Sequence, residues 1–134
     1  RTGIFGWKGE VSFHIGRPLA ELIADQELSL ELSLSVEAIA AIIDREIHSH
    51  YKLFPINYIA LDLIDGIEHH YGAYTEQEKS DVLQYIESRI DLVRLPESLT
   101  PDREYLRRCL LMMYANPVLS KLKTELETRV SLEP

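Results

Sequence analysis

The sequence predicts a mainly α protein, a compact bundle of about five helices preceded by a short N-terminal β-strand or hairpin. From Ser35 onward apolar residues recur every three or four positions, whereas an N-terminal stretch alternates apolar and polar residues. The chain has 134 residues, 46% of them hydrophobic, which suits one domain with one core. We therefore expect a single domain over 1–134, with a strand segment at 1–17 and a helical part at 35–130.

The strand is predicted by strict alternation from Val11 to Ile15, which places the apolar side chains on one face. Gly16 and Pro18 end it. Residues 28–35, with the sequence LSLELSLS, also alternate. Leu and Glu favour helices, however, so this stretch stays open between an extended strand and a loop.

Two helices are predicted before residue 75. The first begins at the N-cap Ser35 and runs to about Tyr51. Its inward face is expected to hold Val36, Ile39, Ala40, Ile43 and Ile47. The second follows Pro55 and ends at Gly72, a natural C-terminal cap. Its apolar stripe comprises Ile56, Ile59, Ala60, Leu63, Ile64 and Ile67.

The remaining helices have clear start signals. Thr75 and Glu78 form a capping box, and that helix ends before Pro96. Its inward residues are Val82, Ile86, Ile90 and Val93. Thr100 is the next expected N-cap, and its helix directs Tyr105, Cys109, Met112 and Met113 inward. Asn116 and Pro117 are expected to interrupt it before a last helix with Val118, Leu119, Leu122 and Leu126.

The charge balance excludes several classes of partner. The chain has 22 acidic and 14 basic side chains, a net charge of −8, and its Lys and Arg residues are scattered. Nucleic acids and anionic lipid surfaces both need a concentrated basic face. A single cysteine cannot form an internal disulfide, so we expect a reducing, cytoplasmic location. No apolar run approaches the roughly 20 residues of a membrane span, so no direct membrane insertion is expected.

The histidines do not form a recognisable metal motif. His48 and His50 are two residues apart on a helix and point in nearly opposite directions. His69 and His70 lie at a helix end, where Asp65 could pair with His69. His14 lies on the polar face of the strand, which is typical of a solvated residue. A metal site at the adjacent pair is the alternative, but the pattern favours no metal ligands.

Other candidate residues also favour ordinary structural roles. Cys109 lies on an expected inward face and is interpreted as an inert core thiol. The glycine-rich residues 3–9 lack the spacing of a phosphate loop, and Asp62 and Asp65 fit a solvated helix face. The basic cluster comprises Arg103, Arg107, Arg108, Lys121 and Lys123. It could bind a phosphate group, or pair with Asp102, Glu104 and Glu125. We therefore assign no catalytic, cofactor-binding or metal residues and expect no cofactor.

Residues 8–19 (KGEVSFHIGRPL) and 57–64 (NYIALDLI) resemble glycerolipid acyltransferases of the glycerol-3-phosphate and lysophosphatidate type. The resemblance implies that residues 11–18 are a late strand of the catalytic sheet and its exit. The family transfers acyl groups with a His-x-x-x-x-Asp motif, but no histidine here has an acid at that spacing.

The resemblance therefore implies a non-catalytic C-terminal region of a phospholipid-biosynthesis enzyme. It implies that this chain is inactive by itself and that Arg1 is the point where a longer chain was cut. Its partner would be the rest of that chain, which would be peripheral at the inner face of the membrane. The alternative is a stand-alone helical interaction or oligomerisation domain that forms a homodimer through its N-terminal strand and Trp7. A third hypothesis is that the chain is a small enzyme or metal protein whose site is formed by the histidines.

Overall fold

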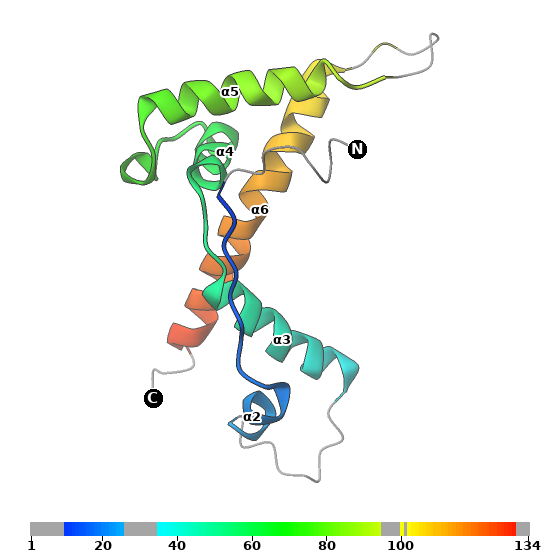
Figure 1. Ribbon diagram of the computed structural model, residues 1–134, viewed down its shortest axis with the longest axis vertical. Coiled ribbons are helices and arrows are strands. Elements are labelled where there is room, and N and C mark those ends of the chain that lie inside the picture. The colour runs from blue at the N-terminus through cyan, green and yellow to red at the C-terminus, as the bar shows by residue number, and fades with distance from the viewer. Residues whose placement is uncertain (1–9, 26–34, 95–99, 101, 131–134) are drawn as a thin grey trace. The chain divides into compact units, whose positions relative to one another are not determined.

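The computed structural model describes residues 10–25, 35–94, 100 and 102–130 (Figure 1). Its α-helices are α2 (Leu19–Ala24), α3 (Val36–His50), α4 (Pro55–Asp65), α5 (Glu76–Ile90) and α6 (Arg103–Val130), with a 3₁₀ turn η1 at Tyr71–Ala73. The mainly α prediction is therefore confirmed. The chain divides into two units, residues 1–52 and 53–134, which are described in turn.

The expected N-terminal strand is not present in the part of the chain that is described. Residues 10–17 form no strand with the other described residues, so the strand prediction is not confirmed for this stretch. A strand needs a neighbour to accept its backbone hydrogen bonds, and none of the described residues supplies one. Residues 1–9, which include Trp7, and residues 28–34 lie outside the described residues.

In the first unit, α3 begins and ends where the sequence predicts. The Ser35 hydroxyl accepts a hydrogen bond from the Ala38 amide at 3.2 Å, and Tyr51 follows the last helical residue. The buried face differs from the prediction, however. Ile42 is buried, whereas Ile43 and Ile47 are 39% and 51% exposed. The helix that packs on α3 within this unit is α2, which has only six residues and covers a narrow strip.

In the second unit, α4 ends earlier than predicted. Gly66 follows its last residue with φ of 70°, a left-handed conformation that glycine adopts without steric cost. The Gly66 amide closes the helix by donating to the Asp62 carbonyl at 2.9 Å. The prediction that Gly72 ends this helix is wrong, since that residue lies in η1. Ile67 consequently leaves the apolar stripe and is 55% exposed.

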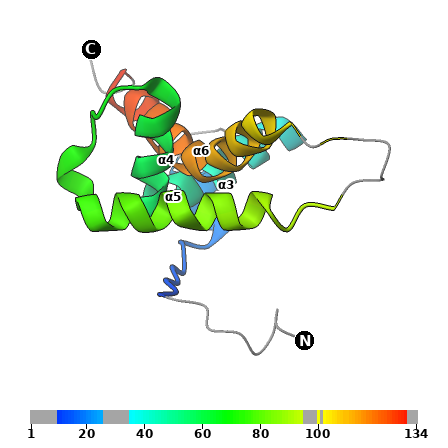
Figure 2. The same cartoon turned by 90° about the horizontal axis from the view of Figure 1, so that it is seen from above.

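The helix α5 follows its prediction closely. The Glu78 amide donates to the Thr75 hydroxyl at 3.2 Å, and the Thr75 amide donates to Glu78 Oε2 at 2.8 Å, which confirms the capping box. Ile86 and Ile90 are buried as expected. Figure 2 shows α5 lying against α4 and α6. The core of this unit comprises Ala60, Leu61, Ile86, Ile90, Leu111, Ala115 and Val118.

The helix α6 runs without a break through Pro117, so the predicted interruption is wrong. A proline inside a helix removes one backbone hydrogen bond, here the one to the Met113 carbonyl. Ala115 and Val118 are both buried on either side of this point and hold the two halves in the core. In addition, the Asn57 side chain of α4 donates to the Tyr114 carbonyl at 2.8 Å.

The start and the buried face of α6 also differ from expectation. Asp102, and not Thr100, accepts a hydrogen bond from the Tyr105 amide, at 3.0 Å. The predicted inward face is wrong, because Tyr105 is 64% exposed, Met113 is 55% exposed and Cys109 is exposed. The core packs on the opposite side, through Leu111, Ala115 and Val118. Within the described residues, no helix combines the length and apolar character needed to cross a membrane.

Candidate functional site

Segment 10–17 crosses the C-terminal turns of α3 (Figure 1). Two of its even-numbered side chains, Glu10 and His14, contact that helix and the residues just after it. Glu10 forms an ion pair with Lys52, and the rings of His14 and His50 stack in parallel with their centroids 4.4 Å apart. The polar face of the alternating pattern is therefore the face that lies on α3.

A glycine permits the closest approach between the segment and α3. A Cβ atom at Gly16 would lie 3.1 Å from both Cγ and Oε1 of Glu46, which is tighter than normal contact. Next to it, the Arg17 amide donates to Glu46 Oε1 at 3.1 Å. Glu46 therefore anchors the end of the segment through a backbone hydrogen bond.

The odd-numbered side chains of the same segment are exposed. Val11, Phe13 and Ile15 have exposed fractions of 57%, 90% and 95%. Three consecutive apolar side chains on one face of an extended segment are costly to leave in water, at about 1.5–3 kcal/mol each. Among the described residues, nothing covers this face, which makes it the strongest candidate for an interaction surface in the first unit.

Three groups with metal-binding chemistry meet beneath this segment. His14, Glu46 and His50 each offer one ligand atom, and these atoms lie within 4.8 Å of one another. Sequence reasoning missed the cluster because it weighed His50 only against His48 and did not consider Glu46 four residues before it. The spacing of Glu46 and His50, four residues apart on a helix, was the readable signal. The approach of His14 depends on tertiary structure.

The other histidines are not gathered into a site. His48 contacts Tyr51 edge-on, with ring centroids 5.9 Å apart. The proposed pairing of His69 with Asp65 is replaced by one between the neighbouring residue, His70, and Asp62, which are 2.7 Å apart. An adjacent pair at a helix end therefore does not converge on one ligand.

Asp62 is the centre of a buried polar network in the second unit. Its carboxylate accepts from the His70 amide at 3.0 Å and from the Tyr74 hydroxyl at 2.8 Å, besides contacting the His70 ring. Burial alone would raise the pKa of Asp62, but the hydrogen bonds from His70 and Tyr74 outweigh it and lower the pKa below 3.8. Burial and the bond to Asp62 raise the pKa of Tyr74. The network closes the turn after α4, so we interpret it as structural.

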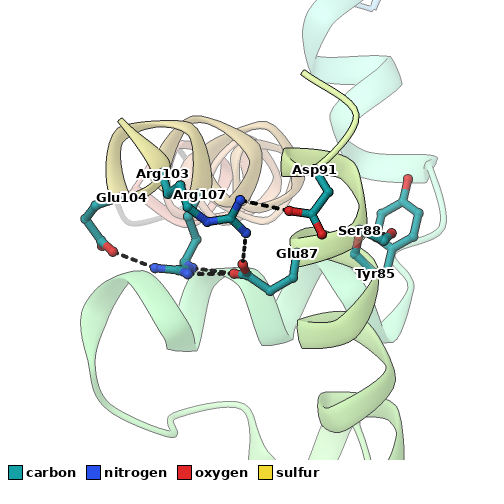
Figure 3. A network of polar contacts seen from close by, with 7 residues as sticks. All are labelled: Tyr85, Glu87, Ser88, Asp91, Arg103, Glu104 and Arg107. Carbon is teal, nitrogen blue, oxygen red and sulfur yellow. Dashed lines mark hydrogen bonds and ion pairs between the residues drawn. The ribbon is translucent and has the colours of Figure 1, made fainter. Parts of the chain in front are cut away.

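Two arginines of the basic cluster, Arg103 and Arg107, pair with acids at the end of a neighbouring helix (Figure 3). Arg103 contacts Asp91 and Glu87, each at 2.8 Å, and Arg107 donates to Glu87 at 2.8 Å. Hydrogen bonds from Arg107, which has the larger effect, and from Arg103 lower the pKa of Glu87. Glu87 lies on α5 and Asp91 is the C-cap residue that follows this helix, while Arg107 also binds Glu104 at 2.6 Å. Because their donors are engaged, the structure favours intrachain pairing over phosphate binding at these two arginines.

Arg108 lies apart from that network and lines two depressions of the second unit. One, of about 170 Å³, is bordered by Leu63, Ile64, Glu104 and Leu111. The other, of about 430 Å³, lies along the exposed side of α6, beside Tyr105, Cys109, Met112, Met113 and Asn116. The prediction of a buried core thiol is wrong, because Cys109 opens onto this second depression.

Comparisons with known proteins give no further guide: no family model matches the chain, nor does any curated protein or solved structure.

Proposed function

We propose that this chain is the non-catalytic C-terminal region of a glycerolipid acyltransferase that takes part in phospholipid biosynthesis. One observation carries the proposal: segment 10–17 lies on α3 by its polar face and exposes Val11, Phe13 and Ile15 on the other. An apolar face of this kind is stable only when a second layer of structure packs on it and removes its side chains from water. The resemblance of residues 8–19 to the family's late strand supplies the identity of that layer, the sheet of the catalytic domain.

The energetics of the exposed face support this arrangement. Burying Phe13 and Ile15, which are almost fully exposed, would contribute about 1.5–3 kcal/mol per side chain. Backbone pairing to a neighbouring strand would add its hydrogen bonds, each with a net contribution of about 0.5–1.5 kcal/mol. The segment would thus act as an edge strand that joins the helices of this chain to the catalytic sheet.

Acyl transfer itself would occur in the other part of the enzyme. The family's general base is a histidine oriented by an aspartate five positions later, and this sequence has no such pair. The proposed role is therefore attachment and support, with acyl chains transferred to a glycerolipid acceptor only by the complete enzyme.

The test uses the longer protein that contains these 134 residues. Acyl transfer from an acyl thioester to glycerol-3-phosphate or lysophosphatidate is measured for that protein, for this chain alone, and for a double variant with Phe13→Asp and Ile15→Asp. We expect activity in the longer protein, none in this chain, and a loss in the double variant. A matched double variant on the polar face of the neighbouring α3, Asp44→Asn with Arg45→Gln, should stay active. A longer protein that lacks the His-x-x-x-x-Asp motif and the activity would refute the proposal.

A second candidate is a stand-alone helical interaction or oligomerisation domain. It is favoured by the outer side of α6, where Tyr105 and Met113 are 64% and 55% exposed. Sedimentation velocity distinguishes the two candidates. A stable homodimer of this chain, dissociated by Phe13→Asp or by Met113→Glu, would favour oligomerisation, whereas a monomer at high concentration would exclude self-association as the role of this chain.

A further inference from the structure

We propose that His14, Glu46 and His50 form a binding site for a divalent transition-metal ion of the Zn²⁺ class. Two imidazoles and one carboxylate are a ligand set that binds zinc in proteins and leaves a fourth position open. All three residues belong to the first unit of this chain. Metal binding can therefore be measured on the chain by itself, whatever the outcome for the proposed acyltransferase role.

The distances are close to those that coordination requires. The three ligand atoms lie within 4.8 Å of one another. Bonds of 2.0–2.1 Å to a tetrahedral ion place two ligand atoms about 3.3 Å apart. The rings of His14 and His50 are stacked in parallel, so a shared ion requires the ring of the exposed His14 to turn about its side-chain bonds, while His50 keeps its hydrogen bond to the Glu46 carbonyl.

The tautomer of His50 suits metal binding. Its Nδ1 atom lies 2.9 Å from the backbone carbonyl of Glu46, which accepts a hydrogen bond from the protonated nitrogen. The proton held at Nδ1 leaves the lone pair of Nε2 available for the ion. Metal-binding histidines commonly donate their second ring nitrogen to a carbonyl or carboxylate in this way.

Glu46 is positioned to serve as the third ligand. Its side chain is only 14% exposed, and Oε1 accepts the Arg17 amide at 3.1 Å. That bond orients the carboxylate beside the two imidazoles, and one of its oxygens lies within 4.8 Å of the ligand atoms of both histidines. The negative charge of Glu46 also offsets part of the charge of the metal ion.

His14 reaches the site because both ends of its segment are held, one by α3 and the other by a residue just after that helix. The Glu10–Lys52 ion pair holds one end, and the close approach of Gly16 to Glu46 holds the other. A bound ion would add a third link between the segment and the helix. It would thereby fix which face of the segment is turned outward.

The experiment titrates the chelator-treated 134-residue chain with Zn²⁺ by isothermal calorimetry, and with Co²⁺ by visible absorption. We expect one ion per chain. His14→Gln and His50→Gln should each weaken binding by at least about tenfold. His48→Gln is the matched control, because it removes a histidine from the same helix outside the cluster, and it should bind as the wild type does.

A second readout is amide hydrogen exchange across residues 10–17, which Zn²⁺ should slow in the wild type and not in His14→Gln. The proposal is overturned if no Zn²⁺ binds, or if both cluster variants bind as tightly as the wild type. Circular dichroism of each variant confirms that a loss of binding does not reflect unfolding. Retained binding in those variants would place the ion elsewhere in the chain.

Discussion

The packing of the second unit predicts a large difference between two substitutions on one helix. Ile86 and Leu83 both lie in α5, but Ile86 is 1% exposed and belongs to the core cluster, whereas Leu83 is 41% exposed. Ile86→Ala and Leu83→Ala each remove three carbon atoms and introduce the best helix former. The comparison therefore isolates burial from helix propensity.

The magnitude follows from transfer and cavity terms. Three buried carbon groups at about 0.8 kcal/mol each contribute roughly 2.4 kcal/mol, before any cavity is counted. The core around Ile86 comes from three helices and cannot fully collapse, so Ile86→Ala should lower the free energy of unfolding by about 3–4 kcal/mol. At Leu83 water already reaches much of the side chain, so no closed cavity forms, and we expect about 1 kcal/mol.

Urea unfolding followed by far-ultraviolet circular dichroism measures both values on the full chain. The wild-type denaturant slope should be retained, so that the change lies in the midpoint. Equal losses in the two variants, or a larger loss for Leu83→Ala, would refute the assignment of Ile86 to the core.

Three further substitutions test polar contacts of the second unit. Asp62→Asn should remove an acid-dependent part of the stability: the lowered pKa of Asp62 stabilises the fold above about pH 4, and this contribution disappears as the pH falls below 3.8. Unfolding curves at several pH values check this, and an unchanged pH dependence in Asp62→Asn would contradict it. Asn57→Ala should cost about 1–3 kcal/mol, because it leaves the buried bond to Tyr114 unmade. A loss below about 0.5 kcal/mol in urea would argue against that bond. Arg107→Ala should cost less than about 1 kcal/mol, since its pairing with Glu87 is partly exposed and screened by salt. A larger loss that persists in high salt would show that this pair is stronger than its exposure implies.

Local signals along the chain predict the helix ends well. Ser35 and the Thr75–Glu78 capping box act within one turn, so the sequence contains all the information they need. The end of α4 was misplaced because two glycines, Gly66 and Gly72, both satisfy the same sequence rule. Only the backbone shows which of them is left-handed.

The buried faces are harder to predict, because they depend on neighbouring helices. The periodicity of α6 allows two apolar stripes, one with Tyr105 and Met113 and one with Leu111 and Val118. Contact with α4 and α5 selects the second stripe. Pro117 likewise signals a break by itself, yet packing on both sides of it keeps one helix.

The candidate sites likewise combine features that local sequence signals predict with contacts between distant segments that they do not predict. Glu87, which pairs with both Arg103 and Arg107, lies on α5 more than ten residues earlier, and no spacing rule identifies it. Glu104, by contrast, lies three residues before Arg107 at a spacing that the sequence shows. The polar and apolar faces of segment 10–17 could be predicted from alternation alone. The contact of its polar face with α3, and hence the meeting of His14 with His50, could not.

The most direct test of the proposed role is amide hydrogen exchange of residues 11–15 in two samples, this chain alone and the longer protein that contains it. We predict fast exchange in the isolated chain, where no strand partner is available among the described residues, and strong protection in the longer protein, where the segment joins a sheet. Equally fast exchange in both samples would contradict the account.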